Sequence, residues 1–193
     1  MSRDGAIIGV SDHNGWAVLM TVAGDGTLLD RRRVELVDAD LPRMPHHHEA
    51  QTLPLDQALD LVERVRVSAD RHATLALDAV AIAVPSRIRG VAIRACPPLP
   101  ATIGERIRNY RAQNVADTVM YRNALAGAAE SRGWSVQWYD AKKVFDAACD
   151  ALQVKNLDAH FLQTKRSVGP PWNKDHKLAM AAAIVATARG KRA

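Results

Sequence analysis

Two aspartates occupy positions where a cation could bind. Asp12 follows an apolar run, Ala6–Val10, and precedes a turn at Asn14-Gly15, whereas Asp175 lies in the first turn of a predicted final helix. Carboxylate oxygens are the ligands that Mg²⁺ prefers, so Asp12 and Asp175 are the candidate catalytic and metal-binding residues. Each also has a structural interpretation, because aspartate is a common turn residue and a carboxylate at a helix N-terminus gains about 0.3–1 kcal/mol from the dipole.

A second group of metal-ligand types stands in the run His46-His47-His48-Glu49. His46, His48 and Glu49 are its candidate ligands for Zn²⁺ or Ni²⁺. Such a site needs at least three side chains that converge on one point, and the side chains of adjacent residues point in different directions. We therefore favour a solvated loop here.

The charge balance permits binding to a polyanion without requiring it. The 193 residues include 26 Lys and Arg against 21 Asp and Glu, a formal charge of +5. Trp172 and Tyr110 stand among the basic residues and could stack on bases. The partner that we expect is branched or duplex nucleic acid, and the candidate binding residues are Arg87, Arg89, Lys142, Lys143, Lys165, Arg166, Lys174 and Lys177.

Composition excludes several other classes of protein. Cys96 and Cys149 are too few for a disulfide framework, and the longest apolar run, Leu178–Ala188, is too short to cross a bilayer. We therefore expect a cytoplasmic protein with no membrane partner; a homodimer is compatible with the sequence. There is no Walker-type phosphate loop and no Gly-x-Ser-x-Gly elbow.

The elements that position these residues begin with an antiparallel meander. Its predicted strands are Ala6–Val10, Trp16–Val22 and Thr27–Leu36, and the Asn14-Gly15 pair suits a turn with positive φ. Residues 37–53, rich in proline and histidine, are predicted to form a loop insertion.

Helices and strands alternate in the rest of the chain. Pro54–His72 has the apolar stripe of an amphipathic helix. Ala79–Val84 is a short apolar run without alternation, which predicts a central fourth strand, and Ser135–Tyr139 alternates and predicts a fifth. The other expected segments are an irregular stretch at Arg87–Pro100, a helical region at Ala101–Arg132 divided near Gln113-Asn114, a helix at Lys142–Leu152, a basic loop at Lys165–Lys174, a helix at Asp175–Arg189 capped by Asn173, and a basic tail, residues 190–193.

This order predicts one α/β domain, residues 1–193. Its core would be a five-stranded mixed sheet in the order 3-2-1-4-5 with helices on both faces, with strand 2 antiparallel to the rest. Ribonuclease H-like proteins and actin-like ATPases both begin in this way, and the chain is too short for the duplicated domain of the ATPases.

Four segments resemble the RuvC-type Holliday-junction resolvases of the ribonuclease H-like superfamily. Gly9–Val18 is similar to the first hairpin of those enzymes, and Val80–Ala83 is similar to their fourth strand. Ala124–Tyr139 followed by Ala141–Val144 is similar to their alanine-rich helix, fifth strand and lysine-bearing turn, and Lys174–Ile184 is similar to their last helix.

The resemblance implies a site of four acidic or histidine side chains that hold two Mg²⁺ ions. On this alignment the first-strand aspartate falls at Ser11, with Asp12 one place later, and the fourth-strand glutamate falls at Ala83. The last helix keeps Asp175 but has Leu178 in place of its partner. We therefore expect Asp12 and Asp175 to approach each other beside Ser11 and Ala83, with Mg²⁺ as the only cofactor to consider.

The function that follows is nucleic-acid binding with a degenerate, weakly active or inactive nuclease site. The alternatives are an active metal-dependent endonuclease or junction resolvase with rearranged ligands, and a non-catalytic protein-interaction module on the same fold.

Overall fold

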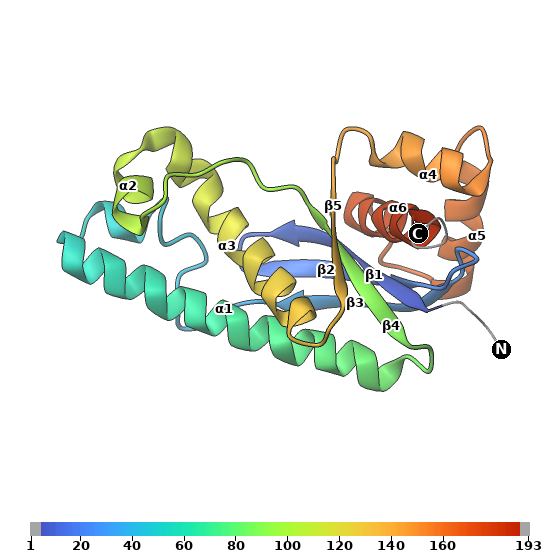
Figure 1. Ribbon diagram of the computed structural model, residues 1–193, viewed down its shortest axis with the longest axis horizontal. Coiled ribbons are helices and arrows are strands. Elements are labelled where there is room, and N and C mark those ends of the chain that lie inside the picture. Colours follow the sequence, from blue (N-terminus) through green and yellow to red (C-terminus); the bar gives the residue numbers. More distant parts are fainter. Residues whose placement is uncertain (1–4, 190–193) are drawn as a thin grey trace.

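A five-stranded mixed sheet forms the centre of the computed structural model, which describes residues 5–189 (Figure 1). The strand order is β3-β2-β1-β4-β5, as predicted. The strands are β1 (Ala6–His13), β2 (Trp16–Val22), β3 (Leu28–Glu35), β4 (Ile88–Arg94) and β5 (Ser135–Tyr139). β2 is antiparallel to its neighbours β1 and β3, whereas β1, β4 and β5 run parallel.

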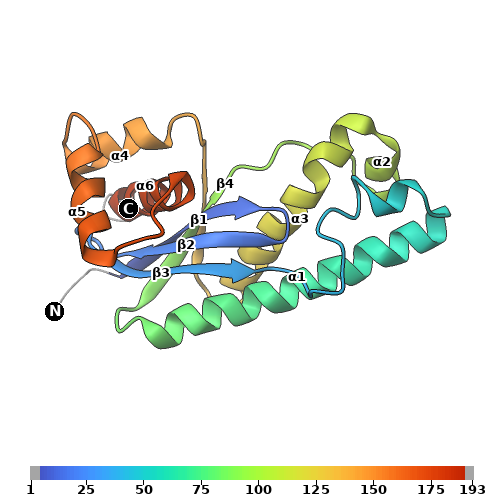
Figure 2. The ribbon, with the colours of Figure 1, turned by 180° about the vertical axis from the view of Figure 1, so that it is seen from behind.

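Helices cover the sheet in two groups (Figures 1 and 2). The helices α1 (Leu55–Ala83), α2 (Ile103–Arg108) and α3 (Tyr110–Glu130) lie on one side, and α4 (Val144–Leu152), α5 (Asp158–Val168) and α6 (Lys174–Arg189) lie on the other. A separate apolar core lies on each face: Ile8, Leu19 and Val91 pack towards α1 and α3, and Ile7, Met20 and Ala92 pack towards α6. Alternation along the strands produces this division.

The predicted fourth strand is wrong. Ala79–Ala83 completes α1, a helix of 29 residues, and β4 instead comes from Ile88–Arg94 in the stretch expected to be irregular. Val80 is buried while Ala81, Ile82 and Ala83 are exposed, which is the one-sided burial of a helix. A short apolar run cannot by itself distinguish a buried strand from the end of a helix.

Several smaller boundaries also differ from expectation. The break in the helical region 101–132 falls at Asn109, whose side chain accepts hydrogen bonds from the backbone of Arg111 and Ala112, rather than at Gln113-Asn114. Lys165–Val168 ends a helix, α5, in place of a basic loop. The predicted Asn173 cap is confirmed, since its Oδ1 lies 3.0 Å from the backbone nitrogen of Asp175.

Residues 37–53 contain one short 3-10 turn, Glu49–Gln51, and otherwise irregular structure. No helix within residues 5–189 has both the length and the apolar character needed to span a membrane. The predicted basic tail, 190–193, lies outside the described residues.

Candidate functional site

The first turn of α6 meets the carboxyl end of β1, and this contact forms the centre of the candidate site. The Ser11 hydroxyl donates a hydrogen bond to Asp175 Oδ1 at 3.1 Å, and His13 Nε2 lies 2.9 Å from the same oxygen. The Asp175 side chain is 21% exposed and that of His13 is 40% exposed. The expected approach of Asp175 to Ser11 is therefore present, with His13 as an additional partner.

Close approach of α6 to β1 depends on Gly9. A Cβ atom at this position would lie 1.8 Å from the carbonyl oxygen of Ala179, so any side chain would collide with the helix backbone. The absence of a side chain at Gly9 lets α6 lie directly on β1, and the start of the helix then reaches Ser11.

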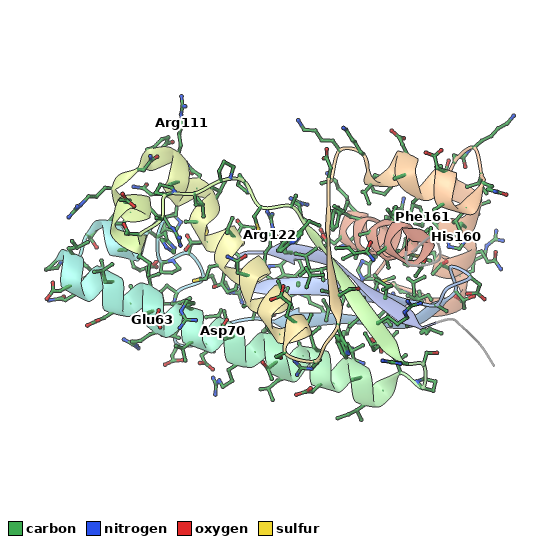
Figure 3. The ribbon with its side chains drawn as sticks, viewed as in Figure 1. Glu63, Asp70, Arg111, Arg122, His160 and Phe161 are labelled. Carbon is green, nitrogen blue, oxygen red and sulfur yellow. The ribbon has the colours of Figure 1, made fainter. Side chains whose placement is uncertain are left out.

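Asp12 lies on the other face of the sheet, which corrects the expectation that Asp12 and Asp175 come together. Successive residues of a strand point to opposite faces, so Ser11 faces α6 and Asp12 faces α3. Arg122 Nε of α3 donates to Asp12 Oδ2 at 2.8 Å, and both side chains are buried. Figure 3 shows Arg122 on the side of α3 towards the sheet. Asp12 is thus the partner of a buried arginine rather than a second ligand beside Asp175.

Ala83 does not lie in the site either, because it ends α1 and is exposed. The fourth strand of the structure is β4, in which Ala92 pairs with Gly9. The pairing of β1 with β4 ends there, and Arg94 follows two residues later on the same face of β4 as Ala92. A cation therefore stands on the strand from which the resolvase pattern would supply a glutamate.

Tyr139 of β5 pairs with Arg94 of β4. Its hydroxyl donates to the carbonyl oxygen of Val10 at 2.7 Å. Burial raises the pKa of Tyr139 to about 12, against the opposing effect of nearby Arg94. The phenol is therefore neutral near pH 7 and supplies no anionic ligand.

These residues do not fit a pair of Mg²⁺ ions. Paired-metal catalysis needs carboxylates clustered around both ions. Asp175 already has two hydrogen-bond partners, Ser11 and His13, and Glu35, at the end of β3 on the same face, is paired with Arg33 and Arg43. Across residues 5–189, no three His, Cys, Asp or Glu side chains are grouped so as to hold a metal ion.

The histidine-rich loop does not form a metal site. His46 Nδ1 lies 2.7 Å from Asp117 Oδ1 inside the protein, and the backbone nitrogens of His46 and His47 also donate to that carboxylate. His48 and Glu49 are exposed. His46 thus anchors the loop to α3, and the three candidate ligands do not converge.

The predicted nucleic-acid-binding residues lie in three places: after β5, between α5 and α6, and at the start of β4. Lys142 and Lys143 follow the carboxyl end of β5, at the same edge of the sheet as Ser11, and both are exposed. Lys165, Lys174 and Lys177 line one cavity of about 540 Å³ between α5 and the start of α6, and Arg166 is exposed nearby on α5. Arg87 and Arg89 lie at the amino end of β4, at the opposite edge of the sheet.

Aromatic stacking next to Asp175 was missed by the sequence analysis. The His13 and Trp16 rings stack with centroids 4.0 Å apart and planes at 4°, and the Arg33 guanidinium lies 4.4 Å from the Trp16 ring. Alternation places Trp16 and Arg33 on one face, but their contact depends on the register of β2 against β3, which the sequence does not display.

Comparison with known proteins identifies the fold. No protein-family model matches the chain, and no curated protein matches it. Among solved structures, a Thermus thermophilus RuvC in complex with a Holliday junction substrate matches at 12% identity and a TM-score of 0.54, covering 97% of this chain and 96% of that one. A second Thermus thermophilus RuvC structure matches at 12% identity and a TM-score of 0.50 with the same coverage. The chain therefore has the ribonuclease H-like fold of the RuvC type.

Proposed function

We propose that this protein binds branched or duplex nucleic acid and does not cleave it by a paired-metal mechanism. The cavity between α5 and α6 is the observation that most supports this, because three lysines and three aromatic rings meet there. Lys165, Lys174 and Lys177 supply the charge, and the rings are those of Phe145, Phe161 and Trp172.

Charge in this cavity favours phosphate. Among its lining residues Asp158 is the single acid against the three lysines. Lys177 Nζ lies 5.9 Å from the centroid of the Phe161 ring, which holds the ammonium group at the wall of the cavity. Basic side chains that track a backbone beside aromatic stacking surfaces are a common arrangement in nucleic-acid-binding proteins.

The surface continues from the cavity to Asp175 and Trp16. Lys174 precedes Asp175 in the first turn of α6, and the stack of His13, Trp16 and Arg33 lies on the same face of the sheet. A phosphate backbone crossing the start of α6 would meet Lys174 on one side of Asp175 and, on the other side, Arg33, which is shared with Glu35 at 3.0 Å. One of the structures with this fold contains a Holliday junction substrate, which makes a four-way junction the first ligand to test.

Fluorescence anisotropy with a labelled four-way junction over a salt series tests the binding. Phosphate contacts release counterions, so the logarithm of affinity should fall linearly with the logarithm of salt concentration. We expect the double variant Lys174→Gln/Lys177→Gln to bind about tenfold more weakly at low salt, with a salt slope reduced by roughly 1–2. The control, Arg64→Gln/Lys155→Gln, removes two exposed cations elsewhere and should bind within about twofold of the parent protein. Absence of binding at low salt, or equal loss in both double variants, would refute the proposal.

A cleavage assay on the same junction separates this function from that of an active endonuclease. With Mg²⁺ or Mn²⁺ we expect no cleavage above background, because Asp175 alone cannot form a paired-metal clamp. Robust cleavage that the Asp175→Asn variant abolishes would show that a rearranged ligand set is active.

A further inference from the structure

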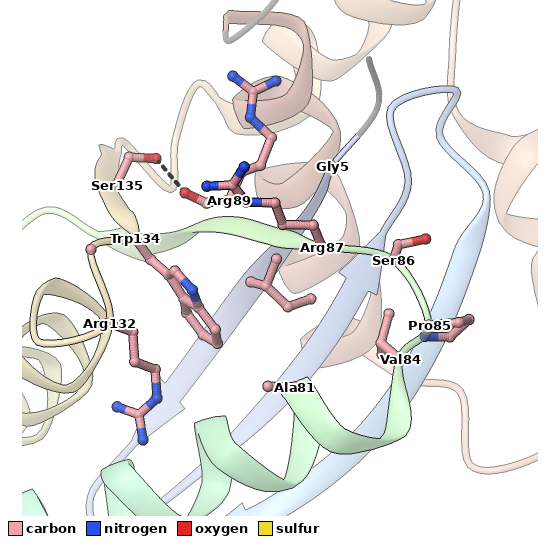
Figure 4. Close-up of a pocket in the computed structure, with 12 residues that line it drawn as sticks. Gly5, Ala81, Val84, Pro85, Ser86, Arg87, Arg89, Arg132, Trp134 and Ser135 are labelled. Carbon is pink, nitrogen blue, oxygen red and sulfur yellow. Dashed lines mark hydrogen bonds between the residues drawn. The ribbon is translucent and has the colours of Figure 1, made fainter. Parts of the chain in front are cut away.

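A second cavity, of about 1120 Å³, lies at the edge of the sheet opposite the proposed nucleic-acid surface. Its walls come from the end of α1, the start of β4 and the turn between α3 and β5 (Figure 4). Ala81 and Val84 lie on the first of these segments, and Gly133 and Trp134 on the last. The cavity is large enough for a mononucleotide.

Two cations in this cavity have no anionic partner among residues 5–189. Arg87 and Arg89 are both exposed, and neither guanidinium forms an ion pair or side-chain hydrogen bond with any residue in 5–189. Arg132 also lines the cavity, but Asp78 neutralises it through a contact of 3.0 Å from Nε. Since no Asp or Glu is among the described lining residues, these two positive charges have no counter-charge within residues 5–189.

Arg87 and Arg89 lie at the start of β4. Figure 4 shows both side chains beside Gly5, on the opposite side of β4 from Trp134. A Cβ atom at Gly5 would lie 2.1 Å from Arg89 Cγ, so the arginine side chain occupies the space that any other residue would need. Ser135 Oγ donates to the carbonyl oxygen of Arg89 at 3.2 Å and ties this strand to β5. This packing holds the stem of the Arg89 side chain, and Arg87 lies two residues earlier in the lining of the same cavity.

An aromatic surface lies in the same cavity. Trp134 is half-buried, and the Arg132 guanidinium lies 5.7 Å from its ring centroid on one side. Guanidinium groups bind phosphate through several N–H donors, and an indole ring can stack on a nucleobase. All three residues line one cavity, so a ligand that contains both a phosphate and a base and passes round the start of β4 would meet the arginines and the indole ring.

We propose that this cavity binds a nucleoside 5′-phosphate, with Arg87 and Arg89 on the phosphate and Trp134 against the base. The ligand is either a free mononucleotide or the phosphorylated 5′ end of a nucleic-acid strand. Because the cavity lies at the amino edge of β4, this site is separate from the surface around α6.

Isothermal titration calorimetry with adenosine 5′-monophosphate, adenosine and inorganic phosphate tests the ligand chemistry. We expect the monophosphate to bind at least tenfold more tightly than adenosine. The Arg87→Gln/Arg89→Gln variant should lose at least tenfold in affinity for the monophosphate. Arg108→Gln/Arg111→Gln, which removes two exposed arginines from α2 and α3, should retain it within twofold. Trp134→Leu should weaken binding of the monophosphate but leave binding of inorganic phosphate unchanged.

Single-stranded octanucleotides with a 5′-phosphate or a 5′-hydroxyl distinguish the two sources of the ligand. If the 5′-phosphorylated octanucleotide binds at least tenfold more tightly, and this preference disappears in Arg87→Gln/Arg89→Gln, the site binds strand ends. If adenosine 5′-monophosphate binds tightly but the octanucleotides show no such preference, the site binds free nucleotides. Lys174→Gln/Lys177→Gln should bind the monophosphate with the affinity of the parent protein. A failure of junction binding therefore does not refute this second site. Binding of neither phosphorylated probe, equal affinity for adenosine and its monophosphate, or equal loss in the control variant would overturn the proposal.

Discussion

Asp12 and Asp175 lie near the same end of β1 but on opposite faces of the sheet, and their surroundings differ. Asp12 is buried and forms an ion pair with Arg122 across 2.8 Å. Asp175 is partly exposed and is held by the neutral Ser11 hydroxyl and by the His13 ring. A buried charge stabilises the fold only while its partner remains, whereas a partly exposed carboxylate can respond to a ligand. The face of the sheet, rather than the residue type, thus decides which aspartate belongs to the site.

Arg122→Met should have the largest effect, because it leaves the Asp12 charge buried without a partner. Asp12 Oδ1 already lacks a hydrogen-bond partner among the described residues. We expect a loss of about 3–5 kcal/mol in the free energy of unfolding, measured by urea denaturation. The double variant Asp12→Asn/Arg122→Met removes both charges and should recover part of this loss. A cost below about 1 kcal/mol for Arg122→Met would show that Asp12 is not a buried ion.

Gly9→Ala should destabilise the α6 face by at least about 1–3 kcal/mol, because the new methyl group would collide with the backbone at Ala179. Gly127→Ala is the matched control on the other face. Gly127 is a solvent-exposed residue away from the ends of α3, and a Cβ atom there would meet nothing within 4 Å. Alanine there should stabilise the protein by roughly 0.5–1 kcal/mol. Thermal unfolding of the two variants would refute the close-approach argument if both moved in the same direction.

Asp175→Asn should cost about 0.3–1 kcal/mol, which is the favourable interaction of a carboxylate with the start of a helix. The amide oxygen can still accept the hydrogen bond from Ser11. Asp12→Asn, measured in the same urea titration, should cost more because it leaves Arg122 buried without a counter-charge. A larger loss from Asp175→Asn than from Asp12→Asn would reverse the comparison between the two faces.

Acidification should produce the smallest effect and should act on the α6 face. Burial lowers the pKa of His176, so its neutral form is favoured in the folded state. Below pH 6.5, the ordinary pKa of histidine, His176 is therefore protonated more in the unfolded chain than in the folded protein. The free energy of unfolding should then fall as the pH decreases from 7.5 to 5.5. His176→Gln should flatten this change in the urea midpoint, and the exposed His48→Gln should not. An equal slope in both variants would exclude His176 as the source.

Asp38, which contacts α1, should not contribute over this pH range. Hydrogen bonds from His72 and Ser68 lower its pKa to about 2. The stability that comes from its ionised form is present above the ordinary pKa of aspartate and is lost only as pH falls towards 2. A pH dependence between 7.5 and 5.5 that disappears in Asp38→Asn would contradict this assignment.

Local sequence signals were enough for the hairpin and the last helix. The Asn14-Gly15 turn forms with Gly15 at a φ of 80°, and Asn173 caps α6 as predicted. Both signals depend on backbone geometry within a few residues, so they could be recognised without knowledge of the rest of the fold. The five-stranded order followed from the alternation of elements, even though the fourth strand was assigned to the wrong segment.

Contacts between distant segments decided the rest. Asp12 and Arg122 are separated by 110 positions, and only the packing of α3 on β1 selects this pair from many acids and arginines. The position of β4 likewise depended on where α1 ended, and it placed Arg87 and Arg89 at the edge of the sheet opposite Ser11. Alternation along β1 assigns neighbouring residues to opposite faces, but which helix covers each face is determined by tertiary packing. The sequence by itself therefore determined the type of fold, and the tertiary structure decided which charges share a site.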